Sequence, residues 1–185
     1  MSNIATALVM VLQTMLPKIG QERFETVIDD MVTVVDSEFK SGNMKSSLER
    51  EEALAMLSAA FIHESGFREE VENCKIVGDG GRSIGLGQVM RGQNWQGYKK
   101  KEICSDRKLQ IKLSLHVIDK CKLQSPKPAA VFRCYTSGDA SKDSHTAQKE
   151  YKSYRTIKSA ISSPEKKKET SNDDKKKKDA QNGVT

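Results

Sequence analysis

The sequence predicts one mainly helical domain with a small β-hairpin or glycine-rich region. Apolar residues recur at offsets of three and four over most of the chain, which is the spacing of helices that bury one face. Seven glycines fall between residues 74 and 98, a density that favours turns and short extended pieces over a long helix. A length of 185 residues suits one domain and is too short for two of ordinary size.

The first expected unit is a helical N-terminal extension, residues 1–45. Its helical pattern runs from Ile4 to about Phe39, and the opening apolar stretch is shorter than the roughly 20 apolar residues that cross a bilayer, so no stable membrane insertion is expected. A cleavable signal peptide would need a small-residue site after that stretch, where Pro17 and Lys18 stand instead. We expect a helix packed on the domain or on a partner, with an uncleaved export segment as the alternative.

The second expected unit, residues 46–163, is the domain proper. Ser46 and Glu49 have the spacing of a capping box, which predicts that a helix begins there and runs to about Gly66. Further helices are expected after Ser105, over 129–135 with Gly138 as its end, and over 146–161.

The third expected unit, residues 164–185, is a lysine-rich tail that we predict to be disordered. It holds seven lysines against five acids, and Ala180 and Val184 are its only apolar residues. Such a segment buries too little surface to offset the entropy that ordering would cost.

The net charge of +6 favours an anionic partner, and peptidoglycan, nucleic acid and anionic lipid all qualify. Aromatic residues make up only 5% of the chain and alternate with basic residues only from Tyr98 to Lys101. This composition argues against nucleic acid.

Four cysteines are present, and no two lie two to four residues apart, so the spacing of a metal site is missing. Four cysteines allow three pairings, and both free thiols and one or two disulfides stay open. An oxidising destination would favour disulfides. The cysteines are Cys74, Cys104, Cys121 and Cys134.

Glu64 is the candidate for acid–base chemistry. It ends an apolar helix, where the negative end of the helix dipole favours the protonated carboxyl. Partial burial against Phe61 or Phe67 acts in the same direction. A glutamic acid in this position can still donate a proton near neutral pH.

The glycine-rich stretch 78–88 follows this helix end. Its glycines allow the backbone to approach a ligand closely, and Gln88 offers an amide to sugar hydroxyl or acetamido groups. A nucleotide loop is a poor alternative, because no strand precedes the Gly-x-Gly pattern and no helix opens on it.

At these residues the chain resembles soluble-type lytic transglycosylases and the related goose-type lysozymes, over roughly residues 47 to 160. Gly87 stands where that family usually has Met, and Thr136 where it usually has Asn. The family's motifs are met in order by Glu64-Ser65-Gly66-Phe67, Gly85-Leu86-Gly87-Gln88, Tyr135-Thr136-Ser137-Gly138 and Tyr151.

The resemblance implies a lysozyme-like α+β domain that cleaves the β-1,4 bond between N-acetylmuramic acid and N-acetylglucosamine in peptidoglycan glycan strands. Glu64 would act as acid and then as base, leaving a 1,6-anhydro product, with no metal or cofactor. The remaining roles that it implies are substrate binding or carboxylate support by Ser65, sugar subsites formed by Gly85, Leu86, Gly87 and Gln88, a hydrogen bond from Tyr151 to Glu64, and a cleft wall shaped by Tyr135.

Asp79 matches only the goose-type branch, in which it would orient an attacking water. It can also be an ordinary turn aspartate. A muramidase that uses Asp79 and a non-catalytic glycan-binding or structural domain are therefore the alternatives to a transglycosylase. The place of action implied is the bacterial cell wall, in the periplasm or on a virion, as in wall enzymes of phages or mobile elements; the oligomeric state stays open.

Overall fold

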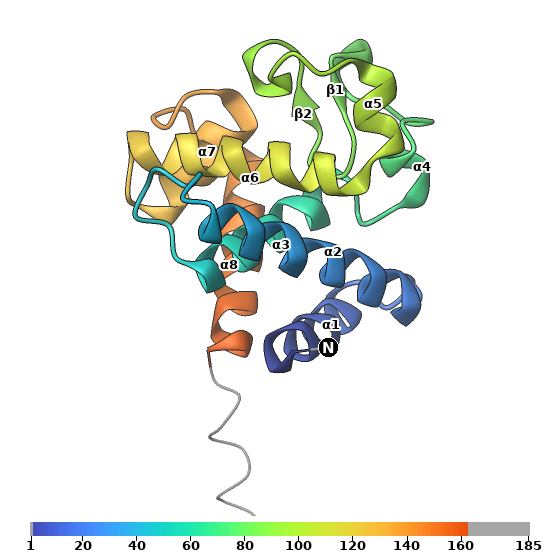
Figure 1. The fold of residues 1–185 in the computed structure, drawn as a ribbon. Coiled ribbons are helices and arrows are strands. Elements are labelled where there is room, and N and C mark those ends of the chain that lie inside the picture. Colours follow the sequence, from blue (N-terminus) through green and yellow to red (C-terminus); the bar gives the residue numbers. More distant parts are fainter. Residues whose placement is uncertain (1, 163–185) are drawn as a thin grey trace, which may run out of the picture.

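The computed structural model describes residues 2–162, so the tail predicted to be disordered lies outside the described residues. The described chain is mainly helical, with eight α-helices and one two-stranded sheet (Figure 1). The elements are α1 (Asn3–Met15), α2 (Gln21–Lys40), α3 (Arg50–Glu64), α4 (Glu69–Glu72), η1 (Asp79–Gly81), β1 (Ser83–Ile84), β2 (Val89–Met90), η2 (Gln93–Trp95), α5 (Lys100–Ser105), α6 (Arg107–Gln124), α7 (Pro128–Ser137) and α8 (His145–Ile161).

The N-terminal pattern forms two helices, and the expectation of one helical run from Ile4 to Phe39 is wrong at one point. α1 ends at Met15 and α2 begins at Gln21, because Pro17 lacks the backbone N–H that a continued helix needs. α1 buries one face against α2 and α8, as expected for a helix packed on the domain. One hydrophobic cluster joins this helix to the rest, so the boundary expected at residue 45 does not separate two cores.

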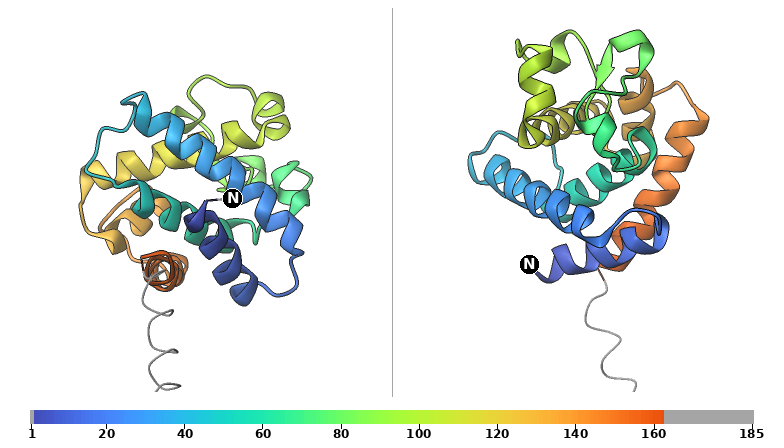
Figure 2. Two further views of the ribbon diagram at one scale, coloured as in Figure 1. Left: turned by 60° about the horizontal axis from the view of Figure 1, so that its bottom comes forward. Right: turned by 90° about the vertical axis from the view of Figure 1, so that its right-hand side faces the viewer.

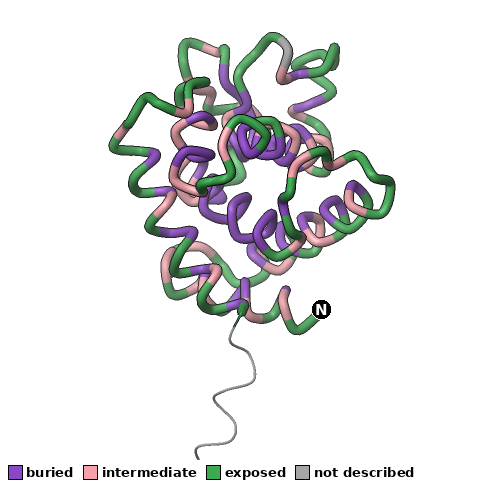
Figure 3. The backbone as a smooth tube through the Cα atoms, turned by 90° about the vertical axis from the view of Figure 1, so that its left-hand side faces the viewer, coloured by how far each residue is buried: buried purple, intermediate pink, exposed green. Residues whose placement is uncertain are grey.

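α3 is the central helix, and every residue from Glu52 to Phe61 is buried. α2, α6 and α8 surround it, and Figure 3 shows the buried backbone gathered in the middle of the molecule. The predicted capping box is wrong, because α3 begins at Arg50 and Glu49 makes no side-chain cap. Ser46 instead donates its backbone N–H and its hydroxyl to the carboxylate of Asp119 on α6, and the charge of this acceptor makes both hydrogen bonds strong.

α6 separates the small β region, with α4 and α5, from the N-terminal helices (Figure 1; Figure 2). β1 and β2 pair antiparallel, Ser83 with Met90 and Ile84 with Val89, and the turn between them is 85–88. A second, smaller apolar cluster that includes Trp95 supports this hairpin. Among the described helices, none combines the length and the apolar character that crossing a bilayer requires.

All four cysteines form disulfides, which decides between the open alternatives. Cys74 bonds to Cys104 and so ties the segment after α4 to α5. Cys121 bonds to Cys134 and ties α6 to α7. The second bond lies next to Tyr135 and therefore helps to fix that side chain against the hairpin.

Candidate active site

A pocket of about 640 Å³ opens between the end of α3, the β hairpin, α6 and α7. It continues into a second hollow along α6 and α7, since Met90, Asn94, Val117, Tyr135 and Thr136 line both. The first pocket is lined by Glu64, Gly78, Asp79, Ser83, Gln88, Val89, Met90, Asn94, Val117, Tyr135 and Thr136.

Glu64 is the last residue of α3 and lines this pocket, at the helix end where the sequence predicted it. Burial raises the pKa of its carboxyl to about 7, a hydrogen bond with Glu150 acts against that rise, and the negative charge of Asp79 adds to it. Its carboxyl is therefore a proton donor at pH values where an exposed glutamate is ionised.

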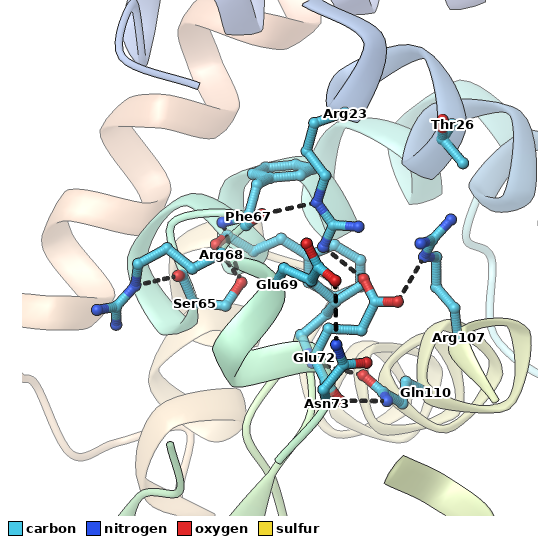
Figure 4. Close-up of polar contacts among 12 residues, drawn as sticks. Arg23, Thr26, Ser65, Phe67, Arg68, Glu69, Glu72, Asn73, Arg107 and Gln110 are labelled. Carbon is cyan, nitrogen blue, oxygen red and sulfur yellow. Dashed lines mark hydrogen bonds and ion pairs between the residues drawn. The ribbon is translucent and has the colours of Figure 1, made fainter. Parts of the chain in front are cut away.

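The turn after α3 holds Glu64 in place. Phe67 takes a left-handed backbone conformation with φ 57°, and its ring packs edge-on against Phe24 and Phe61 at centroid distances of 5.3 and 5.9 Å. The guanidinium of Arg23 donates to the Phe67 carbonyl oxygen at 3.0 Å, as Figure 4 shows. This aromatic anchor leaves the helix end little freedom to move.

Ser65 is part of that turn, and the substrate-binding role expected for it is wrong. Its side chain is buried, and its hydroxyl donates to the Phe61 carbonyl oxygen at 2.9 Å. The Ser65 hydroxyl oxygen in turn accepts the Phe67 backbone N–H at 3.2 Å. Because these bonds occupy the hydroxyl and the pocket lining does not include it, Ser65 closes the helix and does not face a ligand.

The glycines of the 85–88 turn allow its backbone to approach side chains of the protein itself. A Cβ on Gly85 would lie 2.6 Å from Oε1 of Gln110, and one on Gly87 would overlap Ser114 Oγ and lie 2.5 Å from the hydroxyl of Tyr135. The close fit at Gly87 explains why the Met of the family motif would not fit here.

Gln110 of α6 holds this turn in place through side-chain hydrogen bonds. Its Oε1 accepts the backbone N–H of Leu86 at 2.8 Å, and its Nε2 donates to the carbonyl oxygen of Ile103. The same Nε2 donates to the carbonyl oxygen of Glu72 (Figure 4). The Leu86 side chain belongs to the core and not to the pocket lining. Gln88 does line the pocket, and its side-chain amide also donates to the Gly85 carbonyl oxygen at 3.0 Å.

Tyr135 forms the α7 side of the pocket. Its hydroxyl donates to the Gly87 carbonyl oxygen at 2.7 Å and so joins α7 to the hairpin turn. Burial and the nearby charge of Glu64 raise the pKa of this phenol, which therefore keeps its proton. Thr136 follows it in the lining and donates its hydroxyl to the Phe132 carbonyl oxygen within α7.

Tyr151 does not make the hydrogen bond to Glu64 that the resemblance implied. Among the hydrogen bonds of the described residues none joins the two, and the Tyr151 ring stacks on Tyr154. The preceding residue, Glu150, interacts with Glu64 instead. Sequence reasoning missed Glu150, although it shares the buried helical face of Ala147, Tyr154 and Ile157.

Asp79 of η1 also lines this pocket and is exposed. Its carboxylate accepts the Ser83 hydroxyl at 2.7 Å, and its backbone oxygen accepts the Arg82 guanidinium at 3.1 Å. Asp79 is thus both a locally bonded turn residue and a carboxylate at the pocket rim.

Comparisons of this chain with protein-family models, with curated proteins and with solved structures find no match. Within residues 2–162, no group of three or more His, Cys, Asp or Glu side chains is arranged to hold a metal ion.

Proposed function

We propose that this chain is a peptidoglycan lytic transglycosylase on a lysozyme-like helical scaffold. The observation that carries the proposal is the half-buried carboxyl of Glu64, which has a raised pKa and lines the wall of an elongated pocket. Such a group supplies the proton that the leaving oxygen of a glycosidic bond needs. The motifs around it, from Glu64 to Gln88 and at Tyr135, are those of the family that the sequence resembles.

The reaction requires one acid–base group. Glu64 gives its proton to the glycosidic oxygen as the bond from that oxygen to C1 of N-acetylmuramic acid breaks. The C6 hydroxyl of the same sugar then bonds to C1 and returns its proton to Glu64, which closes the 1,6-anhydro ring. Because the attacking hydroxyl is already held next to C1, little of the entropy cost of bringing two reactants together remains.

The pocket walls suit a sugar polymer. The amides of Gln88 and Asn94 and the hydroxyl of Thr136 offer partners for acetamido and hydroxyl groups, while Val89 and Val117 offer apolar surface to the sugar rings. The second hollow extends this surface past Lys120 and Gln124. A pocket continued in this way accommodates several sugars of one strand.

A muramidase reaction is the second candidate, and the position of Asp79 favours it. Its carboxylate lines the same pocket as Glu64 and is free to accept a hydrogen bond from a water. The bond from Ser83 fixes its direction. Hydrolysis would use Asp79 to orient that water, whereas transglycosylation has no need of it.

Lysis of purified sacculi by the full chain and by Glu64→Gln tests the proposal. We expect a rate loss of about 100-fold or more, the share of a general acid–base group. Glu51→Gln is the matched control, because Glu51 is an exposed glutamate at the other end of α3. A folded Glu64→Gln protein that keeps more than about a tenth of the rate would contradict the assignment, and a wild type without lytic activity would favour a glycan-binding domain.

A further inference from the structure

Glu150 on α8 is a buried carboxyl that the mechanism above does not use. It is 0% exposed, and both of its carboxyl oxygens are buried. Among the described residues, no backbone N–H, hydroxyl, amide or cationic group donates to either oxygen. An ionised carboxylate in such a place is strongly unfavourable, so the surroundings select the protonated form.

Among residues 2–162, Glu64 is the group that interacts with this proton. α3 and α8 pack closely against each other, and Figure 2 shows them as neighbours. The imidazole of His63 and the hydroxyl of Ser153 hydrogen-bond at 2.9 Å, which fixes the two helices next to the carboxyl pair.

The other titratable groups around the pair do not neutralise it. Asp79 faces Glu64 from η1 and adds negative charge, and Tyr135 faces both carboxyls from α7 with its phenol protonated. Lys149 is exposed on α8 and acts on His63, whose pKa burial and this lysine lower. The hydrogen bonding of the Glu64 and Glu150 carboxyls must therefore come from the protons that these two groups carry.

We propose, on the basis of the function proposed above, that Glu150 is a positioning residue that stays protonated and donates its O–H to the carboxyl of Glu64. One oxygen of Glu64 is then held on the α8 side. The other oxygen faces the pocket, where the proton transfer takes place.

The electrostatics of the two groups agree with this direction. Burial and the charge of Glu64 raise the pKa of Glu150 far above its ordinary value, while the hydrogen bond from Glu150 lowers that of Glu64 against the effect of burial. Glu64 consequently ionises first. A hydrogen bond to it strengthens as Glu64 becomes a carboxylate, which is the change that occurs when it gives up its proton in the reaction.

Carbon-13 NMR titration of the Glu64 carboxyl tests the proposal in the full chain without substrate, with the signal assigned by its loss in Glu64→Gln. The amide of Glu150→Gln keeps a donor, so the midpoint of the Glu64 titration should stay within about half a pH unit of wild type. Glu150→Leu removes the donor, and the midpoint should rise by about one pH unit or more. A fall of more than about one pH unit in Glu150→Gln would show that Glu150 is ionised and would overturn the proposal, as would a Leu variant that titrates like wild type.

Lysis provides a second readout. Because Glu150 acts through Glu64, Glu150→Leu should lower kcat by about tenfold or more with KM unchanged, and Glu150→Gln should restore most of the rate. Gln148→Leu, on the exposed face of the same helix, is the matched control. The titration needs no activity, so it tests the pair even if the wild type cleaves no glycan, and equal rates in the Leu and Gln variants would contradict a positioning role.

Discussion

Glu64→Gln should stabilise the protein, and the gain should grow with pH. The pKa of Glu64 is raised to about 7 in the folded protein from an ordinary value of 4.5. Below the ordinary pKa both the folded and the unfolded chain carry this proton, so Glu64 costs no stability there. As the pH rises past the ordinary pKa, Glu64 loses its proton in the unfolded chain but keeps it in the folded chain. The free energy of unfolding of the wild type therefore falls with pH until the raised pKa of the folded state is passed.

The size of this effect follows from the difference between the two pKa values. Each pH unit corresponds to about 1.4 kcal/mol, and partial solvent contact of Glu64 reduces the total to about 2–3 kcal/mol at pH 8. A domain of this size gains roughly 2–4 °C in Tm for each kcal/mol. Glu64→Gln should therefore melt about 4–12 °C above wild type at pH 8 and near it at pH 4.

Thermal unfolding followed by circular dichroism at pH 4, 6 and 8 measures this trend. Glu51→Gln, which removes an exposed carboxyl from the same helix, should show no such pH dependence. If the difference in Tm between Glu64→Gln and wild type stayed constant or shrank from pH 4 to pH 8, Glu64 would not have a raised pKa. Glu64 would then be ionised near neutral pH and could not act as the acid.

Three further substitutions separate structural from functional roles at the site. Ser65→Ala should lower the free energy of unfolding by about 1–2 kcal/mol and leave KM for glycan unchanged, because its hydroxyl bonds only to the turn; a raised KM in a fully folded variant would restore the substrate role. Gly87→Ala should cost about 1–3 kcal/mol in denaturant unfolding, since its Cβ meets Ser114 and Tyr135, while Gly20→Ala, with nothing within 4 Å, should change little. Asp79→Asn should retain most of the lytic rate with anhydro ends in the products; a folded but inactive variant would favour the muramidase.

The sequence predicted the features that depend on short-range signals. Gly138 ends α7 in a left-handed conformation, and Glu64 ends α3, both as expected from local patterns. The capping box at Ser46 failed because a residue 73 positions away, Asp119, supplies a better partner. A rule based on neighbouring residues cannot predict a hydrogen bond to a side chain so distant in the sequence.

The candidate site was predictable only in part, for related reasons. A glycine-rich pattern predicts that the backbone lies close to another group, but it does not identify that group. Here the groups are the side chains of Gln110, Ser114 and Tyr135. The disulfide pairing depends on distances that sequence spacing does not fix. Glu150 escaped notice because a glutamate on an amphipathic helix is ordinarily solvent-exposed, and its burial is a property of the α3–α8 interface.

Mass spectrometry of the muropeptides that the wild-type chain releases from purified sacculi tests the central claim most directly. Ring closure by the C6 hydroxyl adds no water to the product, so each new end should be 1,6-anhydromuramic acid, which is lighter by one water than a hydrolysed end. Glu64→Gln should release none. Reducing muramic ends from the wild type would contradict transglycosylation, and equal release by the wild type and Glu64→Gln would contradict the role of Glu64 altogether.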